Sequence, residues 1–586
     1  MAIRTIGCAM LLFLSGVSTA VAQDRDATGS YAFDSSTLEG DPFSGTIFVW
    51  REGAELGGRV FTTLDAPFAI TGVRWLGESE LGVRFNLGPG RVTFRLNLDG
   101  DRFTGAYTFE QGEQKLTREV TGRHRRTERN DLPPTRCVVP GPGFEVRCAM
   151  LHVPEDRHNP TGRWIRLNIV ILPAESEQES SDAMFALAGG PGQAATEIAG
   201  GYAQSMAEIR KHRDVVLVDQ RGTGRSNPLR CDFDDPNARA ALLLSWRFPP
   251  GAMAGCGAEL AERADVRFYH TAVAMADLDA VRQWLGYDRV NLYGGSYGTR
   301  AALTYLRMYP ERTRTVTLRA VIAPSGALPL DNPADAQASL DTIFAECRER
   351  PACHAAYPDL ERDLATVLQR LADDPVRVRV FDPLARDTAS ITLDHAVFAG
   401  ALRRLLMNGD AIPQIPLVVH RAAAGDYDRL LPGISATLGI SRSLYLGMGF
   451  SVVCTEDAER IAAANIEARS GGTFIGPNPA RALVAACEDW SKGVPPDGYD
   501  QPVVEAVPVL ILSGYYDPTT PVRWGREVAR ALPQSTHLIM RNVAHSPFPP
   551  CATEMMTRLV ELGRLEGVGN PCEGVLEPAV YVVPQP

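Results

Sequence analysis

Short segments in which hydrophobic and polar positions alternate fill the first part of the chain. The pattern predicts β-strands, among them 46–50, 59–62, 91–96 and 106–109. Asp99-Gly100 lies between two of these strands and predicts a hairpin turn. Short strands separated by Gly and Asp-Gly across residues 28–122 indicate a small antiparallel barrel or sandwich. This module contains no cluster of catalytic residue types, and we expect it to serve packing or docking.

From residue 137 the pattern changes, because short apolar runs now alternate with longer helical periods. The apolar runs predict buried strands, at 165–172, 184–188, 215–218, 290–293, 316–322, 509–512 and 536–540. Strands that alternate with helices predict an α/β fold with a mostly parallel sheet. A largely helical segment interrupts the alternation, as a cap over an active site would. The predicted organisation is a linker (123–136), a core (137–325 and 506–586) and a cap (326–505).

Composition narrows the functional classes. A chain of 586 residues suggests about two to four domains. Its 45% hydrophobic and 22% charged residues are the balance of a folded globular protein. A net charge of −11 without a dominant basic patch argues against a nucleic-acid partner.

The first residues have the pattern of a secretory signal peptide, predicted at 1–22. Arg4 precedes an apolar run at 6–17 that is too short to span a bilayer. Ala20-Val21-Ala22 fits the small-residue cleavage rule. We expect export to the periplasm or the exterior, with no membrane span in the mature chain.

Ten of the eleven cysteines follow the predicted signal peptide. No Cys-x-x-Cys pair is present, which disfavours a zinc ribbon or a thioredoxin-like motif. In an oxidising compartment these cysteines should form structural disulfides. Sequence alone leaves the connectivity open, but neighbours in sequence suggest the pairs Cys137 with Cys148, Cys231 with Cys256, Cys347 with Cys353, Cys454 with Cys487 and Cys551 with Cys572.

A candidate nucleophile lies in Gly294-Gly295-Ser296-Tyr297-Gly298, between an apolar strand and a helix. A G-x-S-x-G turn of this kind presents its hydroxyl at the carboxyl edge of the sheet. The serine needs a base and an acid, and in this architecture they follow in the order Ser, Asp, His. Asp517 and His545 each come after a later predicted strand. We therefore predict a triad of Ser296, Asp517 and His545.

The oxyanion of an acyl-transfer intermediate needs two backbone N–H donors. Tyr297, directly after the nucleophile, should supply one. Gly190, in the turn Gly189-Gly190-Pro191-Gly192, should supply the other. A phosphate-binding loop is the alternative for this turn, and the lack of a G-x-G-x-x-G motif and of a Walker-type Lys disfavours it.

Four motifs now combine across residues 137–572. They are the glycine turn at 189–192, Asp219-Gln220-Arg221-Gly222-Thr223-Gly224-Arg225-Ser226, the serine turn at 294–299, and Asp517-Pro518-Thr519-Thr520-Pro521. Together they resemble the prolyl iminopeptidase and tripeptidyl aminopeptidase branch of the α/β-hydrolases, above all its secreted, disulfide-bonded members. The resemblance implies an eight-stranded core, a helical cap, no cofactor or metal, and release of residues from free peptide N-termini. Ala188 stands where the family often has His.

An aminopeptidase must recognise an ammonium group, and carboxylates are its natural partners. In the predicted cap, Glu456 and Asp457 follow Cys454, and Glu488 follows Cys487. A bridge between these cysteines would bring the acids together, because it holds the two Cα atoms about 5.5–6 Å apart. The resemblance favours Glu456 as the amine-binding residue. An acidic helix start is the alternative interpretation of Glu456-Asp457.

These observations predict a secreted serine hydrolase that cleaves peptides with free N-termini through an acyl-enzyme. An esterase or amidase acting on small apolar substrates is the alternative within enzymes, because one triad hydrolyses both kinds of bond. A catalytically silent binding protein on the same scaffold is a third hypothesis, which a missing triad member would have favoured.

Overall fold

The computed structural model describes residues 27, 29–37, 40, 42–52, 55–62, 68–100, 102–125, 131–159, 161–176, 181–233, 235–249, 251–440, 443–567, 569–573 and 579–584. The predicted signal peptide, 1–22, lies outside them. Two compact units meet in sequence between Asp131 and Leu132. Each has its own hydrophobic core.

The first unit is a closed barrel of eight antiparallel strands, each paired with the next and the last with the first. The strands are β1 (Gly29–Ser36), β2 (Pro42–Glu52), β3 (Glu55–Thr62), β4 (Phe68–Trp75), β5 (Glu80–Leu87), β6 (Gly90–Asp99), β7 (Arg102–Gln111) and β8 (Gln114–Arg125). Along β6 the side chains of Val92, Phe94 and Leu96 are buried, whereas those of the residues between them are more exposed. This alternation follows from the two-residue period of a strand, which sends every second side chain into the barrel. Of the two predicted forms, barrel or sandwich, the chain adopts the barrel.

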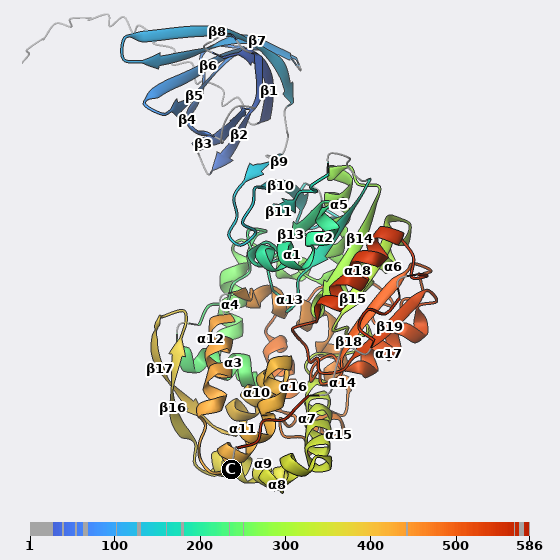
Figure 1. Ribbon diagram of the computed structural model, residues 1–586. Coiled ribbons are helices and arrows are strands. Elements are labelled where there is room, and N and C mark those ends of the chain that lie inside the picture. The colour runs from blue at the N-terminus through green and yellow to red at the C-terminus, as the bar shows by residue number, and fades with distance from the viewer. Residues whose placement is uncertain are drawn as a thin grey trace, which may run out of the picture. The chain divides into compact units, whose positions relative to one another are not determined.

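The second unit contains a nine-stranded mixed sheet in the order β19-β18-β15-β14-β12-β13-β11-β10-β9 (Figure 1). Its strands are β9 (Leu132–Cys137), β10 (Val146–Pro154), β11 (Trp164–Leu172), β12 (Asp182–Leu187), β13 (Val215–Val218), β14 (Arg289–Gly295), β15 (Thr313–Arg319), β18 (Val509–Gly514) and β19 (Ser535–Met540). The six strands from β13 to β19 in this order run parallel, and β9 to β11 add an antiparallel edge. The sheet has one strand more than the resemblance implied, because Leu132–Cys137, expected as part of a linker, pairs with β10.

Helices cover both faces of this sheet (Figure 1). Phe185 and Leu187 belong to the apolar cluster on the side of α5 (Thr271–Leu285) and α6 (Tyr297–Met308). Met184 and Ala186, the alternate residues of β12, belong to the cluster on the side of α1 (Ala199–Ser205) and α18 (Pro550–Leu562). Burial on both faces explains why the central strands are continuously apolar. The remaining elements around the sheet are η1 (Thr196–Ile198), α2 (Ala207–Arg210), α4 (Ala252–Ala261), η2 (Val266–Phe268), η3 (Pro310–Arg312) and α17 (Val522–Ala531).

The cap is largely helical and occupies one end of the second unit (Figure 1). Its helices are α7 (Asn332–Glu349), α8 (Pro351–Ala356), α9 (Leu360–Asp373), α10 (His395–Leu406), η4 (Gly409–Gln414), α11 (Ile415–Ala423), η5 (Asp428–Leu430), α12 (Leu431–Ile440), α13 (Leu446–Glu456), α14 (Ala458–Ala463), α15 (Ile466–Ser470) and α16 (Asn478–Glu488). A two-stranded hairpin, β16 (Val376–Asp382) and β17 (Asp387–Leu393), also belongs to it.

Two segments outside 326–505 complete the cap. Helix α3 (Pro236–Ser245) packs against α10 and α12, so that Ala240 and Leu244 enter the core of the cap. Residues 579–584 also lie on the cap, where Tyr581 is buried and the Val582 N–H donates to the carbonyl of Pro413 at 2.9 Å. The boundaries drawn from the sequence assigned both segments to the core. The sequence pattern misses them because neither segment is adjacent to the cap along the chain.

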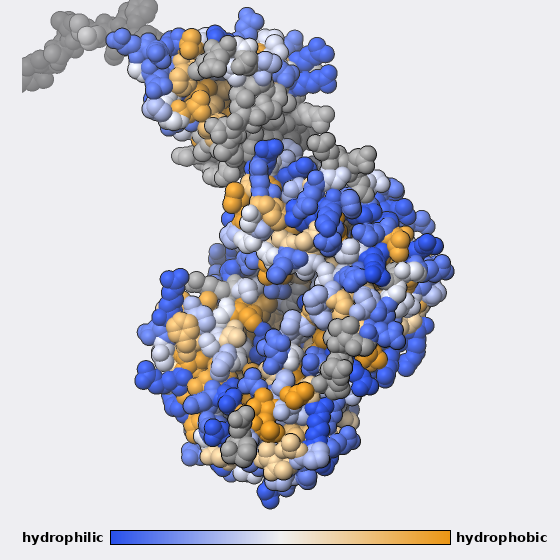
Figure 2. Space-filling view, in the orientation of Figure 1, coloured by the Kyte–Doolittle hydropathy of each residue, from blue (hydrophilic) through white to orange (hydrophobic). Residues whose placement is uncertain are grey.

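Five disulfides join cysteines that are neighbours in sequence order, with Cα atoms 5.2–5.8 Å apart. They are the five pairs that the order of the cysteines suggested. In the described part of the chain, no helix combines the length and the apolar character that a membrane crossing requires. The face seen in Figure 2 is mostly hydrophilic, with apolar residues in scattered groups.

Candidate active site

Ser296 occupies the sharp turn between β14 and α6, with φ 56° and ψ −126°. Positive φ is costly for a residue with a Cβ and is typical of a nucleophile held by its surroundings. The flanking glycines make the turn possible. A Cβ on Gly294 would lie 2.3 Å from the carbonyl oxygen of Gly298, and a Cβ on Gly298 would lie 2.4 Å from that of Leu187. The predicted elbow is therefore present at the carboxyl end of a central strand.

Asp517 and His545 lie beyond the carboxyl ends of β18 and β19 and contact each other. The His545 Nδ1 atom is 2.8 Å from Asp517 Oδ2. Asp517 is buried, and its Oδ1 accepts hydrogen bonds of 2.9 Å from the N–H groups of Thr519 and Thr520. Burial by itself raises the pKa of Asp517, but the charge of His545 and the hydrogen bonds from His545 and Thr520 outweigh it and lower the pKa. The carboxylate is thus held ionised beside the imidazole.

Thr520 is a member of this site that the sequence analysis did not assign. Its hydroxyl donates to Asp517 Oδ2 at 2.6 Å and lies 3.1 Å from His545 Nδ1. The motif at 517–521 could have indicated this role, because a Thr three residues after an Asp can donate its hydroxyl to the carboxylate across a turn. Thr520 therefore helps to fix the geometry of the Asp-His pair.

The glycine turn at 189–192 packs directly against Ser296. A Cβ on Gly189 would lie 3.2 Å from Ser296 Cβ, so only glycine fits there without displacement. Gly190 and Gly192 have φ of 110° and 103°. The N–H of Tyr297 is at the first position of α6, where no acceptor within the helix is available. The assignment of Tyr297 and Gly190 as oxyanion donors stays a prediction.

Asp219 fixes the position of the segment that follows the glycine turn. Its Oδ1 accepts from the N–H of Thr196 at 2.9 Å, and its Oδ2 accepts from Asn168 Nδ2 at 2.8 Å. The Arg225 N–H also donates to Oδ2, at 3.1 Å. One buried carboxylate therefore joins β11, η1 and its own loop, and the motif at 219–226 supports the oxyanion turn from behind.

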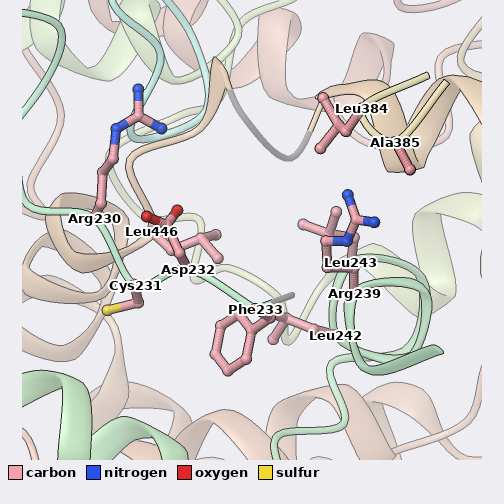
Figure 3. A pocket seen from close by; sticks show the side chains of 10 residues that line it. All are labelled: Arg230, Cys231, Asp232, Phe233, Arg239, Leu242, Leu243, Leu384, Ala385 and Leu446. Atoms are coloured by element: carbon pink, nitrogen blue, oxygen red, sulfur yellow. The ribbon is translucent and has the colours of Figure 1, made fainter. Parts of the chain in front are cut away.

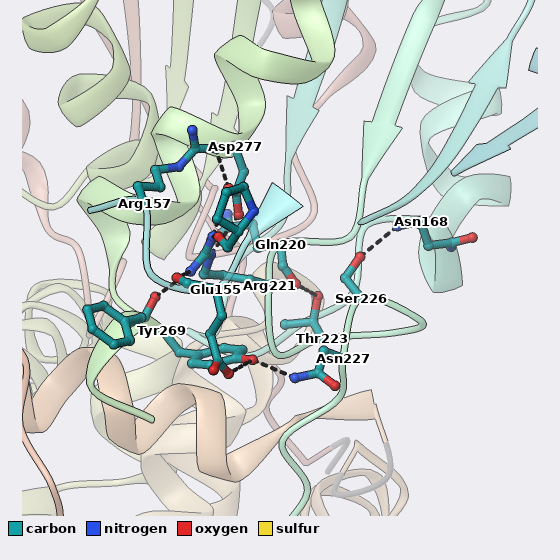
Figure 4. Close-up of polar contacts among 12 residues, drawn as sticks. Glu155, Arg157, Asn168, Gln220, Arg221, Thr223, Ser226, Asn227, Tyr269 and Asp277 are labelled. Carbon is teal, nitrogen blue, oxygen red and sulfur yellow. Dashed lines mark hydrogen bonds and ion pairs between the residues drawn. The ribbon is translucent and has the colours of Figure 1, made fainter. Parts of the chain in front are cut away.

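Arg221 of the same motif is fully buried, and its guanidinium is bonded to groups of the surrounding fold (Figure 4). Its guanidinium makes two bonds to the carboxylate of Asp277, of 2.7 and 2.8 Å. It also donates to the carbonyls of Glu155 and Phe268, at 2.7 and 3.0 Å. A buried guanidinium with a bidentate partner and satisfied donors stabilises a fold rather than binding substrate.

Of the predicted amine-binding acids, Glu456 and Asp457 lie together at a buried arginine, whereas Glu488 lies apart from them at the surface. Glu456 is buried, and its Oε1 accepts from the Thr271 N–H at 2.8 Å. Arg300, from the helix that Ser296 begins, lies 2.9 Å from Asp457 Oδ2 and 3.4 Å from Glu456 Oε2. Burial raises the pKa of Glu456, and Arg300 and Thr271 partly oppose this rise. Glu488 is exposed, although the bridge from Cys454 to Cys487 is formed. No simple motif identified Arg300 in advance.

A cavity of about 450 Å³ opens beside the first turn of α13 (Figure 3). Apolar side chains and three charged ones line it, among them Arg230, Asp232 and Leu446. Leu446 follows Tyr445, whose N–H donates to the carbonyl of Gly192 at 2.8 Å. The cavity therefore adjoins the segment that packs on the glycine turn. Among the described residues, no group of three or more His, Cys, Asp or Glu side chains is arranged to hold a metal ion.

Comparison with known proteins agrees with this geometry. Residues 186–376 match a model of the alpha/beta hydrolase fold, and residues 473–572 match a model of TAP-like proteins. Serine protease Hip1 of Mycobacterium tuberculosis is 24% identical over 423 residues, which cover 66% of this chain and 79% of that protein. Tripeptidyl aminopeptidase of Streptomyces lividans is 27% identical over 199 residues, which cover 31% of this chain and 36% of that protein.

Among solved structures, proline iminopeptidase of Mycobacterium smegmatis is 14% identical over 71% of this chain and 95% of that chain. The TM-score of this pair is 0.31. The chain has the α/β-hydrolase fold, is similar to TAP-like proteins over residues 473–572, and is a serine hydrolase.

Proposed function

We propose that this hydrolase is a peptidase that removes residues from the free N-termini of peptides. The observation that carries the proposal is the Asp517-His545 pair, 2.8 Å apart, on the same sheet edge as a serine in a strained strand-helix turn. The relatives support a peptide bond as the target, because one is a serine protease and another a tripeptidyl aminopeptidase. The cap supports an exopeptidase, because covering the site restricts access to the ends of a chain.

The proposed reaction begins when Ser296 Oγ attacks the carbonyl carbon of the scissile peptide bond. His545 accepts the serine proton through Nε2, while Asp517 holds the Nδ1–H and stabilises the imidazolium. The N–H groups of Tyr297 and Gly190 donate to the oxyanion of the tetrahedral intermediate. The C–N bond then breaks, and His545 gives its proton to the leaving amine. Water, activated by the same imidazole, attacks the acyl-enzyme and releases the N-terminal fragment.

The cavity beside α13 is the proposed place for the N-terminal residues of the substrate. Its volume of about 450 Å³ lies within the usual range for ligand sites, about 300–1,000 Å³. Asp232 supplies a carboxylate on its wall (Figure 3). Glu456 and Asp457 stay the candidates predicted from the sequence for holding the ammonium, in competition with their bonds to Arg300. Two sets of acids can thus be compared by mutation.

A panel of chromogenic amides tests the proposal. Aminoacyl, prolyl and tripeptidyl amides are compared with their N-acetylated forms, and Ser296→Ala serves as the inactive control. We expect free-amine substrates to be hydrolysed and acetylated ones to be poor. Equal rates on free and acetylated amides would refute the exopeptidase proposal. Hydrolysis of small esters without any amide hydrolysis would favour the esterase alternative.

A further inference from the structure

Two adjacent arginines in the last turn of α10 stand beside the catalytic loops. Arg403 Nη2 donates to Thr519 Oγ1 at 2.8 Å, and Thr519 is two residues after the triad acid. Directly after α10, the carbonyl of Met407 accepts from the Ser546 N–H at 3.1 Å. Ser546 is the residue after His545. The end of this cap helix is therefore bonded to the loops of both Asp517 and His545.

Neither of these arginines forms an ion pair within the described part of the chain. No carboxylate there lies within ion-pair distance of Arg403 or Arg404. The Nε atom of Arg403 is buried and has no hydrogen-bond partner. Arg404 Nη1 reaches only the sulfur of Met407, at 3.6 Å. By contrast, the buried Arg221 and Arg300 each contact a buried Asp. Cations at a helix C-terminus complement the helix dipole, but that role requires neither burial nor an unused donor.

Electrostatics in this part of the cap favour an anion. Burial and the charge of Arg404 lower the pKa of Arg403 to about 10, although Asp517 and Asp335 oppose the decrease. Both arginines nevertheless stay charged at neutral pH. A buried or half-buried cation pair with free donors is stabilised by a carboxylate, which accepts from a guanidinium in a bidentate geometry.

The position of the two arginines relative to the triad indicates which part of the substrate they would contact. His545 must protonate the leaving amine, so the leaving fragment lies on the side of the histidine loop. Arg403 contacts the loop of Asp517 through Thr519. Arg404 contacts the sulfur of Met407, whose carbonyl is bonded to the histidine loop through the Ser546 N–H. In a short peptide, the anion always present on the leaving fragment is its C-terminal carboxylate.

We propose that Arg403 and Arg404 form a subsite for the C-terminal carboxylate of a short leaving fragment. The proposal rests on the peptidase function proposed above and adds a substrate class: short peptides with both ends free. Each residue of an extended peptide adds at most about 3.3–3.6 Å. A fixed pair of cations can therefore meet the carboxylate only for a narrow range of fragment lengths. Such an enzyme would consume the small products of other peptidases rather than intact proteins.

Matched pairs of peptides test this subsite. The N-terminal part is constant, the leaving fragment has one to four residues, and each peptide is made as the free acid and as the C-terminal amide. We expect kcat/KM of the acid to exceed that of the amide by on the order of 10- to 100-fold at one length. In Arg403→Gln and in Arg404→Gln this acid-to-amide ratio should decrease towards one, and Arg404→Lys should restore part of it. Arg421→Gln, an exposed cap arginine paired with Asp426, is the control and should keep the wild-type ratio.

Two results would overturn the subsite. One is a wild-type ratio near one at every length, which needs no variant and so does not depend on how a variant folds. The other is a preference that requires an acidic side chain in the leaving fragment and persists when its C-terminus is an amide. A protein that cleaves no peptide of either kind would instead refute the peptidase function itself.

Discussion

At the scale of single residues, the two oxygens of Asp517 have separate tasks. Oδ1 accepts two backbone N–H groups, and Oδ2 accepts the Thr520 hydroxyl and faces His545 Nδ1. Because Oδ2 is an acceptor, the proton of a neutral His545 belongs on Nδ1. The Nε2 atom then has its lone pair available to accept a proton, as the proposed mechanism requires. The carboxylate thus selects the tautomer as well as the position of the imidazole.

Replacing this carboxylate should affect rate and stability in different pH ranges. Asp517→Asn reverses the tautomer preference, and we expect kcat to decrease by on the order of 10⁴ at neutral pH. The pKa of Asp517 is lowered in the folded protein, so its ionised form contributes stability above the unfolded value of about 3.9. That contribution is lost as the pH decreases through the folded pKa. Thermal unfolding of both proteins from pH 7 to pH 3 should show their Tm difference shrinking below about pH 4. A difference that grows with acid would contradict this assignment.

The second residue-scale prediction concerns Glu456. If its carboxylate holds the substrate ammonium, Glu456→Gln should weaken the binding of free-amine peptides by about 2–5 kcal/mol and so raise their KM. The KM of a small neutral ester should not change. If it only supports Arg300, both substrates should lose equally and Tm should decrease. Glu488→Gln, at an exposed position beyond the same disulfide, is the matched control and should change neither.

At the scale of elements, the turn from β14 to α6 depends on close approach of backbone. Gly298 faces the carbonyls of Leu187 and Ala188, so α6 packs closely against the end of β12 at its first turn. The same strand continues into the glycine turn. A change in one element therefore moves Ser296 and the proposed oxyanion donors relative to each other.

Gly298→Ala tests this dependence, because its Cβ would lie 2.4 Å from a backbone oxygen. We expect a loss of about 1–3 kcal/mol in the free energy of unfolding and a decrease in kcat of about 10²-fold. Gly201→Ala is the control, since Gly201 lies in α1 with nothing within 4 Å of its added Cβ. It should leave kcat unchanged and stabilise by about 0.4–1 kcal/mol. Equal effects of the two variants in chemical denaturation and turnover would contradict the argument.

The sequence predicts an element where a local hydrophobic pattern determines it. It does not predict an element whose position depends on packing against a segment far away in the chain. The runs at 184–188 and 290–293 form the central strands, and the serine turn lies between the elements expected. Residues 132–136 were predicted as the end of a charged, proline-ended linker. They belong instead to the edge strand β9, where Pro133 and Pro134 are tolerated because an edge strand can lack N–H donors. The position of Arg403 depends on how α10 docks on the Asp517 loop, which no local pattern encodes. The exposed position of Glu488 likewise depends on tertiary packing.

At the scale of the whole molecule, the candidate catalytic residues all belong to the second unit. Ser296, Asp517, His545 and all five disulfides lie after Leu132, whereas the barrel has a separate core of aromatic and aliphatic side chains. Phe94 lies at the centre of that core, with the rings of Phe33, Phe85 and Tyr107 around it. The barrel interior is thus filled by its own side chains.

The disulfides give a prediction for the native protein. Mass measurement after alkylation without reductant should find no free thiol among Cys137 and the nine cysteines that follow it. Peptide mapping should find the five sequence-neighbour pairs. Two or more alkylated cysteines in the folded protein, or a bridge between different pairs, would contradict the structure.

These bridges have a consequence for the time course of synthesis. A polypeptide is made from its N-terminus, and here the second cysteine of every pair is made before the first cysteine of the next pair. The partner of any cysteine is at most 33 residues away. If oxidation keeps pace with the emerging chain, each of these ten thiols meets its correct partner while no unpaired thiol of another of these pairs is present. The order of emergence alone then specifies the connectivity, and mispaired species arise only when the whole reduced chain is oxidised at once.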